Sequence, residues 1–355
     1  MAIDTNLAEE VAELEVHARA AARDVLASGA EGAERAHAWS EPMARAFAEL
    51  GTRGLWVPAD CGGDDDLVAA VVAVEAFATG DAGGLLGADR PGPAAGVLRV
   101  LPDRGRARAL AEAALDGGTM LATALIDAVD DVAAGFRVPW APGVEVPHAL
   151  VVAATDGVAV VDGGGLAAEP ASASALWASG GVALQVVDGD AIARHPLDAD
   201  DALVARAVPR LWAGAVLCGV GQAAVDYAVA YGRERIVFGL PVLGHQANAF
   251  DVAWATATLE AARTGLRAAA CHLAAGRAAD GGWLATLAWL EARDAGLRAT
   301  DLGVQMLGGH GYIHDHPAQR WYREARMLVL LFGGADAALD DLADRALDAP
   351  DPLVA

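Results

Sequence analysis

Two short segments in the second half of the chain carry residue types that bind anions. Residues 231–250 read YGRERIVFGLPVLGHQANAF and place Arg235 before a Phe-Gly pair, and residues 304–320 read VQMLGGHGYIHDHPAQR. Arginine side chains and the backbone N–H groups of glycine loops are common donors to phosphate. Each segment alone is a weak signal, because an Arg beside Glu234 is often a solvated pair and GGHG does not complete a GxGxxG loop.

Histidine and cysteine residues were considered as metal ligands. The second segment contains three closely spaced histidines, His310, His314 and His316. No second ligand cluster accompanies them, so we predict no metal. The cysteines are odd in number and lack CxxC spacing, which predicts buried small apolar side chains without disulfides or zinc. They are Cys61, Cys218 and Cys271.

The composition is that of a large, acidic and mainly helical globular protein. The 355 residues include 55% hydrophobic but only 5% aromatic side chains. Formal net charge is −23 and all 25 basic residues are Arg, so the surface repels polyanions and we expect no nucleic-acid partner. The N-terminus, MAIDTNLAEEVAELEV, is acidic where a signal peptide is basic, and no uninterrupted apolar run reaches the roughly 20 residues of a membrane helix. We therefore expect a cytoplasmic protein without membrane contact.

The pattern of the chain changes twice along its length. Residues 1–115 repeat a helical periodicity, 116–198 contain short β-branched runs between turn residues, and 199–355 return to long Ala-rich helices. These ranges predict an N-terminal helical domain, a shortened middle β domain and a C-terminal four-helix bundle. The predicted fold class is mainly α with a small β domain.

Three motifs, taken together, resemble the acyl-CoA dehydrogenase family. Residues 231–250 match its pattern of Tyr, Glu-Arg, Phe-Gly, Pro and then Gln. Residues 304–326 match its Gln-x-x-Gly-Gly-x-Gly-aromatic segment, followed by Pro-x-x-Arg and a basic-acidic-Ala-basic run. LGTRGLWVPADCGG at 50–63 matches its N-terminal turn, with Ala59 in place of the usual acid. The motifs occur in the family's order and cover both helical domains, so the resemblance implies the acyl-CoA dehydrogenase fold.

The resemblance implies FAD as cofactor and an acyl thioester, on CoA or a carrier protein, as substrate. In the family these segments bind the FAD pyrophosphate and adenosine of the neighbouring subunit. The implied cofactor-binding residues are Arg235, Phe238, His245, Gln246, Gln305, Leu307, Gly308 and Gly309. Flavin dehydrogenation also needs a base for the α-proton and donors that polarise the thioester carbonyl.

The catalytic carboxylate of the family is missing from its expected positions. Counting from REAR places the base at Phe332, or at Gly333 with one inserted residue. The position used by other members, at the start of the first long C-terminal helix, is Pro209 before Arg210. Asp336 would have to reach back a full turn, so no catalytic residue is predicted.

The middle domain departs from the family as well. Neither the Gly-Ser-Asp strand nor the Trp-Ile-Thr hairpin that holds the flavin ring is present, and this region is shorter. Trp140 and Trp177 stand here, but a Trp at the edge of a β domain is usually a packing residue. The losses therefore fall on the half of the site that a subunit builds for its own flavin.

These departures favour a base-lacking subunit that pairs with a homologous catalytic subunit in a heteromeric, FAD-dependent dehydrogenase, with FAD bound only in the complex. Three alternatives remain open. The first is a self-sufficient homo-oligomeric acyl-CoA dehydrogenase with a relocated base. The second is a flavin-dependent monooxygenase on the same fold, and the third is a non-enzymatic binding protein. The acyl substrate is not specified by the sequence.

Overall fold

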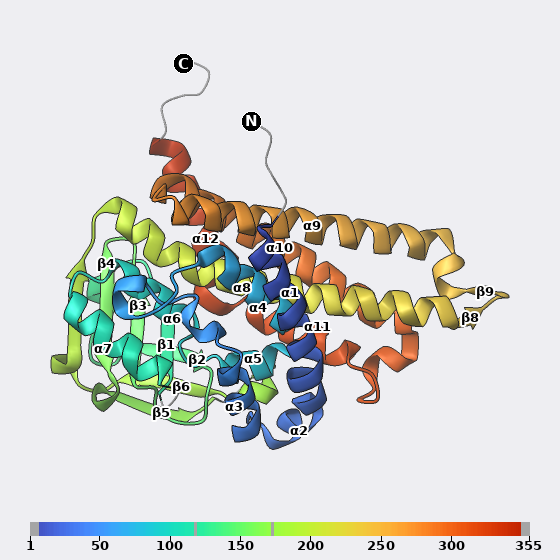
Figure 1. The fold of residues 1–355 in the computed structure, drawn as a ribbon, viewed down its shortest axis with the longest axis horizontal. Coiled ribbons are helices and arrows are strands. Elements are labelled where there is room, and N and C mark those ends of the chain that lie inside the picture. Colours follow the sequence, from blue (N-terminus) through green and yellow to red (C-terminus); the bar gives the residue numbers. More distant parts are fainter. Residues whose placement is uncertain (1–6, 117–118, 172–173, 349–355) are drawn as a thin grey trace, which may run out of the picture.

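The computed structural model describes residues 7–116, 119–171 and 174–348. Helices form the first and last parts of the chain, and strands form the middle, as the sequence predicted. The long helices α8 (Ala199–Glu234), α9 (Gln246–Ala274) and α10 (Ala278–Leu307) run along the longest axis, and the sheets lie at one end (Figure 1).

The N-terminal helices pack on one side of α8. They are α1 (Glu9–Ala21), α2 (Ser28–Ala36), α3 (Glu41–Glu49), α4 (Leu67–Ala78), α5 (Ala82–Ala88), α6 (Gly92–Val97) and α7 (Arg104–Leu115). The Asp66 carboxylate caps α4 by accepting from the Ala69 N–H at 2.9 Å. The sequence did not predict the Gly-rich helices α5 and α6, because they are buried all round and lack an amphipathic pattern.

The middle region forms two sheets. Its strands are β1 (Leu121–Leu125), β2 (Arg137–Ala141), β3 (Ala149–Ala153), β4 (Gly157–Asp162), β5 (Leu166–Pro170), β6 (Val182–Val186) and β7 (Ile192–Pro196). One sheet has the order β1-β3-β4-β7, with β1 parallel to β3, and the other has the order β2-β6-β5. Val138, Leu150 and Leu184 lie in one apolar cluster that joins the two sheets.

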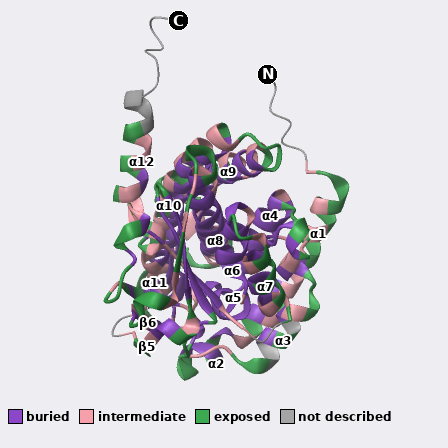
Figure 2. Cartoon of the chain, turned by 90° about the vertical axis from the view of Figure 1, so that its left-hand side faces the viewer, coloured by how far each residue is buried: buried purple, intermediate pink, exposed green. Residues whose placement is uncertain are grey.

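The C-terminal part consists of α8, α9 and α10 with α11 (Ala318–Leu328) and α12 (Gly334–Asp348). Figure 2 shows that buried residues concentrate on α8, which the other helices surround. Among the described residues α8 alone is long and apolar enough to cross a membrane, and 94% of its most apolar window is buried inside the fold. That burial is typical of the central helix of a globular core.

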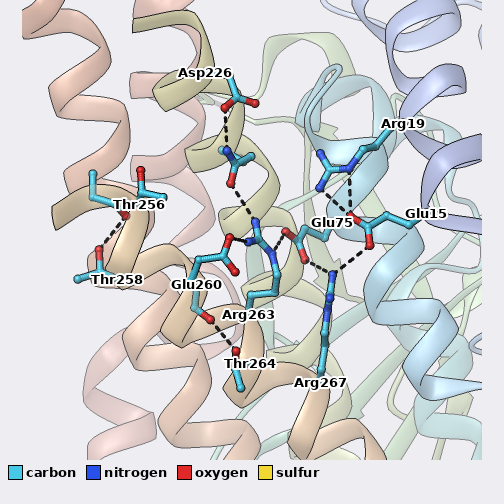
Figure 3. Close-up of polar contacts among 12 residues, drawn as sticks. Glu15, Arg19, Glu75, Asp226, Thr256, Thr258, Glu260, Arg263, Thr264 and Arg267 are labelled. Atoms are coloured by element: carbon cyan, nitrogen blue, oxygen red, sulfur yellow. Dashed lines mark hydrogen bonds and ion pairs between the residues drawn. The ribbon is translucent and has the colours of Figure 1, made fainter. Parts of the chain in front are cut away.

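A buried polar network joins the N-terminal helices to the bundle. Glu75 of α4 is 2% exposed and accepts from the Arg263 Nε of α9 at 2.5 Å. Arg267 lies between Glu75, at 3.5 Å, and Glu15 of α1, at 3.4 Å (Figure 3). Burial disfavours the Arg263 charge, but Glu75 and Glu260 outweigh it and raise the pKa of the guanidinium. The network therefore fixes α9 against α1 and α4.

The cysteine prediction was wrong at one position. Cys61 and Cys218 are buried free thiols, and burial raises the pKa of Cys218 well above its usual range. Cys271 lies near the end of α9 and is exposed. An Ala-rich helix such as this one gives little indication of which face is covered.

Candidate functional site

The two anion-binding segments meet in one surface groove of about 580 Å³, at the end of α8 away from the sheets. Seven of the eight predicted cofactor-binding residues line this groove: Arg235, Phe238, His245, Gln305, Leu307, Gly308 and Gly309. Gln246, the first residue of α9, is exposed and lies next to the groove without lining it. The remaining lining residues are Tyr231, Val237, Val242, Asn248, Met306 and His310.

Local backbone geometry shapes the groove. After α8 ends, the short hairpin of β8 (Ile236–Val237) and β9 (Leu240–Pro241) turns at Phe238 and Gly239, whose φ angles are +52° and +81°. Two positive φ angles are typical of a tight hairpin turn, and they leave the Phe238 side chain 96% exposed. On the other wall, Gly308 takes φ +58°, a conformation that suits glycine and ends α10 at Leu307.

The groove offers several polar groups to a ligand. The Arg235 side chain is exposed at its edge. The His245 ring nitrogen Nε2 lies 3.0 Å from the Val237 carbonyl, and Asn248 Nδ2 donates to the Val242 carbonyl at 2.9 Å. A cation, an amide pair and exposed glycine backbone suit a phosphate-containing nucleotide.

The histidines tested for metal binding divide between two environments. His310 lines the groove, and its ring stacks on His316 with centroids 5.4 Å apart and an interplanar angle of 12°. His314 is exposed. Within the described ranges, no group of three or more His, Cys, Asp or Glu side chains is placed to hold a metal ion.

A second cavity, which we call the closed pocket, lies between the N-terminal helices, the sheets and the start of the bundle. Its volume is about 40 Å³, enough for a few water molecules. Three large rings are among its lining side chains: Trp140 of β2, Trp212 of α8, and Phe332 after α11. The Trp212 and Phe332 rings meet edge to face with centroids 6.5 Å apart. The other lining residues are Leu86, Asp89, Gly92, Pro93, Leu121, Ala122, Thr123, Ala141, Pro142 and Leu331.

The hydroxyl of Thr123 and the carboxylate of Asp89 are engaged inside the chain, whereas the buried Trp140 Nε1 has no hydrogen-bond partner in the described part of the chain. The Thr123 hydroxyl donates to the Val151 carbonyl at 2.9 Å. The fully buried Asp89 carboxylate accepts from Trp212 Nε1 at 3.2 Å and from the Gly92 N–H at 3.3 Å. Burial raises the pKa of Asp89. The sequence around Asp89, GADRPG, contains no signal that indicates which cavity the Asp89 carboxyl faces, so this residue was not among the predicted site residues.

None of the positions predicted for the family's base places a carboxylate in the closed pocket. Phe332 adopts φ +56° and lines the closed pocket, and Gly333 follows with φ +83°. Arg210 is buried on α8, where its Nη1 pairs with Asp341 at 2.5 Å. Asp336 is exposed in the first turn of α12 and does not line the closed pocket.

The two tryptophans of the β region are packing residues, as predicted. Trp140 is 8% exposed. Trp177 donates from Nε1 to the Ser174 carbonyl at 2.8 Å, and the Arg323 guanidinium lies 3.8 Å from the Trp177 ring centre.

The groove and the closed pocket are far apart within one chain. Trp212 and Tyr231 mark them on the same helix, 19 positions apart. At 1.5 Å per residue this is about 28 Å along α8. The groove and the closed pocket are therefore two separate sites on this chain.

Comparison with known proteins gives the family. The model described as acyl-CoA dehydrogenase, N-terminal domain matches residues 8–98, and the model described as acyl-CoA dehydrogenase, C-terminal domain matches residues 202–347. Together these matches span most of the chain. The chain belongs to the acyl-CoA dehydrogenase family. Its members are flavoprotein oxidoreductases of acyl-CoA metabolism, so the family predicted from the three motifs is confirmed.

Individual relatives agree with this assignment. The chain is 37% identical over 125 residues to cyclohexane-1-carbonyl-CoA dehydrogenase of Geobacter metallireducens, covering 35% of this chain and only 32% of that protein. It is 28% identical over 362 aligned positions, and 92% of each chain, to a Mycobacterium leprae protein named probable acyl-CoA dehydrogenase fadE25. The structure of the ChsE4-ChsE5 complex from Mycobacterium tuberculosis has the same fold, with a TM-score of 0.79, 21% identity, and coverage of 98% of this chain and 100% of that chain.

Proposed function

We propose that this acyl-CoA dehydrogenase-family chain is the base-lacking subunit of a heteromeric, FAD-dependent enzyme that oxidises an acyl thioester. In this assembly the groove contributes to an FAD site whose ring and substrate half belongs to a homologous catalytic subunit. The observation that carries the proposal is the contrast between an open groove of about 580 Å³ and a closed pocket of about 40 Å³.

The groove suits the adenosine and pyrophosphate half of FAD. Arg235 supplies a charge-assisted donor to a phosphate oxygen, and the Gly308–Gly309 backbone supplies neutral donors. Gln305 and Asn248 supply amide groups for the edge of a base or a ribose hydroxyl. Bound FAD would provide the hydride acceptor for α,β-dehydrogenation.

The closed pocket does not suit the ring half of FAD. A tricyclic ring needs far more room than a few water molecules, and the Trp140, Trp212 and Phe332 side chains line the small volume that is free. The positions considered for the base hold Phe332, Gly333 and Pro209, none of which accepts a proton. Catalysis is therefore assigned to the partner subunit.

The surface around the groove supports a protein partner. Large exposed apolar side chains lie on the segments that supply its lining, namely the β8–β9 hairpin, the first part of α9 and the loop after α10, and such a concentration marks an interaction site. They are Ile236, Phe238, Leu240, Phe250, Trp254, Tyr312 and Ile313. The M. tuberculosis neighbour is itself a complex of two differently named chains, which favours a hetero-oligomer here as well.

The experiment is to measure the visible spectrum and FAD-to-protein ratio of the purified chain, alone and co-expressed with a base-containing homologue from the same genome. We expect no flavin on the isolated chain and about one FAD per pair of chains in the mixture. Stoichiometric FAD on the isolated chain would contradict the proposal. Failure of the mixture to form a flavin-containing complex would favour a non-enzymatic binding protein.

One observation favours a second candidate function, a self-sufficient acyl-CoA dehydrogenase with a relocated base. Asp89 is a carboxyl group in the closed pocket, and its raised pKa is typical of groups that exchange protons. If the isolated chain binds FAD and oxidises acyl-CoA, Asp89→Asn should abolish turnover while retaining flavin. An unchanged rate in that variant would exclude Asp89 as the base.

A further inference from the structure

An aromatic column leads from the core to the groove. The buried Trp321 of α11 meets Tyr227 edge to face, with centroids 5.6 Å apart. Tyr227 meets His316 edge to face at 6.0 Å, and His316 stacks on His310. His310 is the exposed end of this column and lines the groove. The column therefore presents a supported ring to any ligand in the groove.

Two hydroxyl groups fix the imidazole rings. The Tyr227 hydroxyl lies 2.8 Å from His316 Nδ1, and the Tyr231 hydroxyl lies 3.0 Å from His310 Nδ1. Tyr227 and Tyr231 are four positions apart on α8, so both side chains leave the same face of the helix. A rigid helix thus holds both histidines, although these belong to the loop between α10 and α11.

The geometry leaves one face of the His310 ring to the groove. His316 lies nearly parallel to one face, at 12°. Tyr231 is nearly perpendicular to the His310 ring, at 83°, and its hydroxyl meets Nδ1 in the ring plane, so it covers an edge. Because His316 and Tyr231 cover one face and one edge of the ring and His310 lines the groove, the second face is the one left for a ligand.

We infer that His310 is the stacking platform for the adenine ring of the bound dinucleotide. This inference rests on the proposed function, in which the groove holds the adenosine half of FAD. A preordered aromatic face suits a flat purine, because stacking needs no particular pattern of hydrogen-bond donors. Gln305, Asn248 and the Gly309 backbone lie in the same groove and suit the polar edge of that base. Tyr231 and His316 are positioning residues, since they act through His310.

The test uses the heteromeric complex and measures the rate of FAD loss by recovery of flavin fluorescence after dilution. His310→Ala should accelerate FAD loss about tenfold, within the range found for removing an aromatic stacking partner. His310→Phe should retain FAD at close to the original rate, because it keeps a ring but no nitrogen. His314→Ala, in the same loop but outside the groove, is the matched control and should not differ from the original complex.

Three results are distinguishable. If His310→Ala and His310→Phe release FAD equally fast, a ring nitrogen matters and the stacking role is wrong. If Arg235→Ala releases FAD and neither His310 variant does, the platform is wrong and the proposed function stands. If none of these variants alters FAD loss, the groove does not hold flavin, and the proposed function fails with the platform. Elution of each variant as an intact complex shows that the substitution has not prevented assembly.

Discussion

The groove and the closed pocket share one helix and differ in almost every physical respect. The groove is open, bordered by exposed aromatic rings, and lined by Arg235, two amides and glycine backbone. The closed pocket is lined by rings, and its carboxyl and hydroxyl groups already have partners inside the chain. An open groove with an exposed cation at one end, and a pocket with little free volume at the other, fit the proposal of a subunit that binds a ligand together with a partner.

The contrast between the groove and the closed pocket also shows that a chain can keep the fold of its family while one of its cavities is small. Both regions are built on helices and strands that the acyl-CoA dehydrogenase fold provides, so the scaffold is retained even where the free volume is small. Trp140, Trp212 and Phe332 line a pocket of only about 40 Å³ in a chain that keeps the family fold. Substitutions in the buried ion-pair network, in the groove and in the closed pocket should therefore have separate effects.

The largest expected effect comes from the scaffold. Glu75→Ala removes the buried partner of Arg263 and leaves a guanidinium that is 9% exposed (Figure 3). Breaking a buried ion pair in this way costs about 3–5 kcal/mol. Urea unfolding should show that loss, whereas Glu31→Gln, which breaks the exposed pair with Arg35, should change stability by less than about 1 kcal/mol. Equal effects of the two variants would show that the network does not hold α9 in place.

The next effect belongs to the groove. Arg235→Ala should remove a charge-assisted hydrogen bond to the pyrophosphate, worth about 1.5–3 kcal/mol, so FAD leaves the complex about 10- to 150-fold faster. Stability should not change, because Arg235 is exposed. Arg233→Ala is the control, since this arginine is exposed two positions away and does not line the groove. Equal FAD retention in all three proteins would contradict the assigned groove.

How much could be read from the sequence differs between the two regions. The groove residues stand in motifs of fixed spacing, and seven of the eight predicted cofactor-binding residues line the same groove. The closed pocket draws on Asp89, Thr123, Trp140 and Trp212, which are far apart in the sequence and carry no common pattern. Their meeting depends on how the sheets pack against the helices, and single-sequence periodicity does not contain that information. The absence of a carboxylate at Phe332 and Gly333 could be read from the sequence, because those positions follow a motif at a fixed spacing.

The same limit applies to secondary structure. The long C-terminal helices and the hairpin β3–β4 followed from local periodicity and turn residues. The helices α5 and α6 did not, since AGGLLGA and GPAAGV are poor helix formers that tertiary burial stabilises. The short strand β1 pairs in parallel with β3, 28 positions later in the chain, and this non-local pairing has no local signal.

A smaller effect concerns the support of the closed pocket. Glu324 of α11 is fully buried, and its Oε1 accepts from the Gly83 N–H of α5, the helix that leads to Asp89. Burial first, and then the nearby Asp81 carboxylate, raise the pKa of Glu324 well above its ordinary value. A raised pKa means that the folded protein holds a proton that the unfolded chain loses above about pH 4.3.

The sign of the pH effect follows from this. The stabilisation from protonated Glu324 is complete below the unfolded pKa and is lost as the pH rises through the folded pKa. Glu324→Gln keeps a neutral side chain at every pH, so its stability relative to the original protein should increase as the pH rises from 4.5 to 8. Urea midpoints at the two pH values measure the difference. A constant difference would show that Glu324 has the same proton affinity in both states.

The last prediction is that restoring a carboxylate near the closed pocket produces no dehydrogenase activity. It tests directly whether the closed pocket can hold a flavin ring. Phe332→Glu and Gly333→Glu restore a carboxylate at the two positions where the family's base is expected. Neither variant should oxidise acyl-CoA as an isolated chain, because the closed pocket lined by Trp140 and Trp212 has too little free volume for a flavin ring. The measurement is reduction of an artificial electron acceptor, with the base-containing homologue as the positive control. Appreciable turnover by either variant would mean that this chain builds a ring site of its own, and the contrast between the two regions would then lie in the base alone.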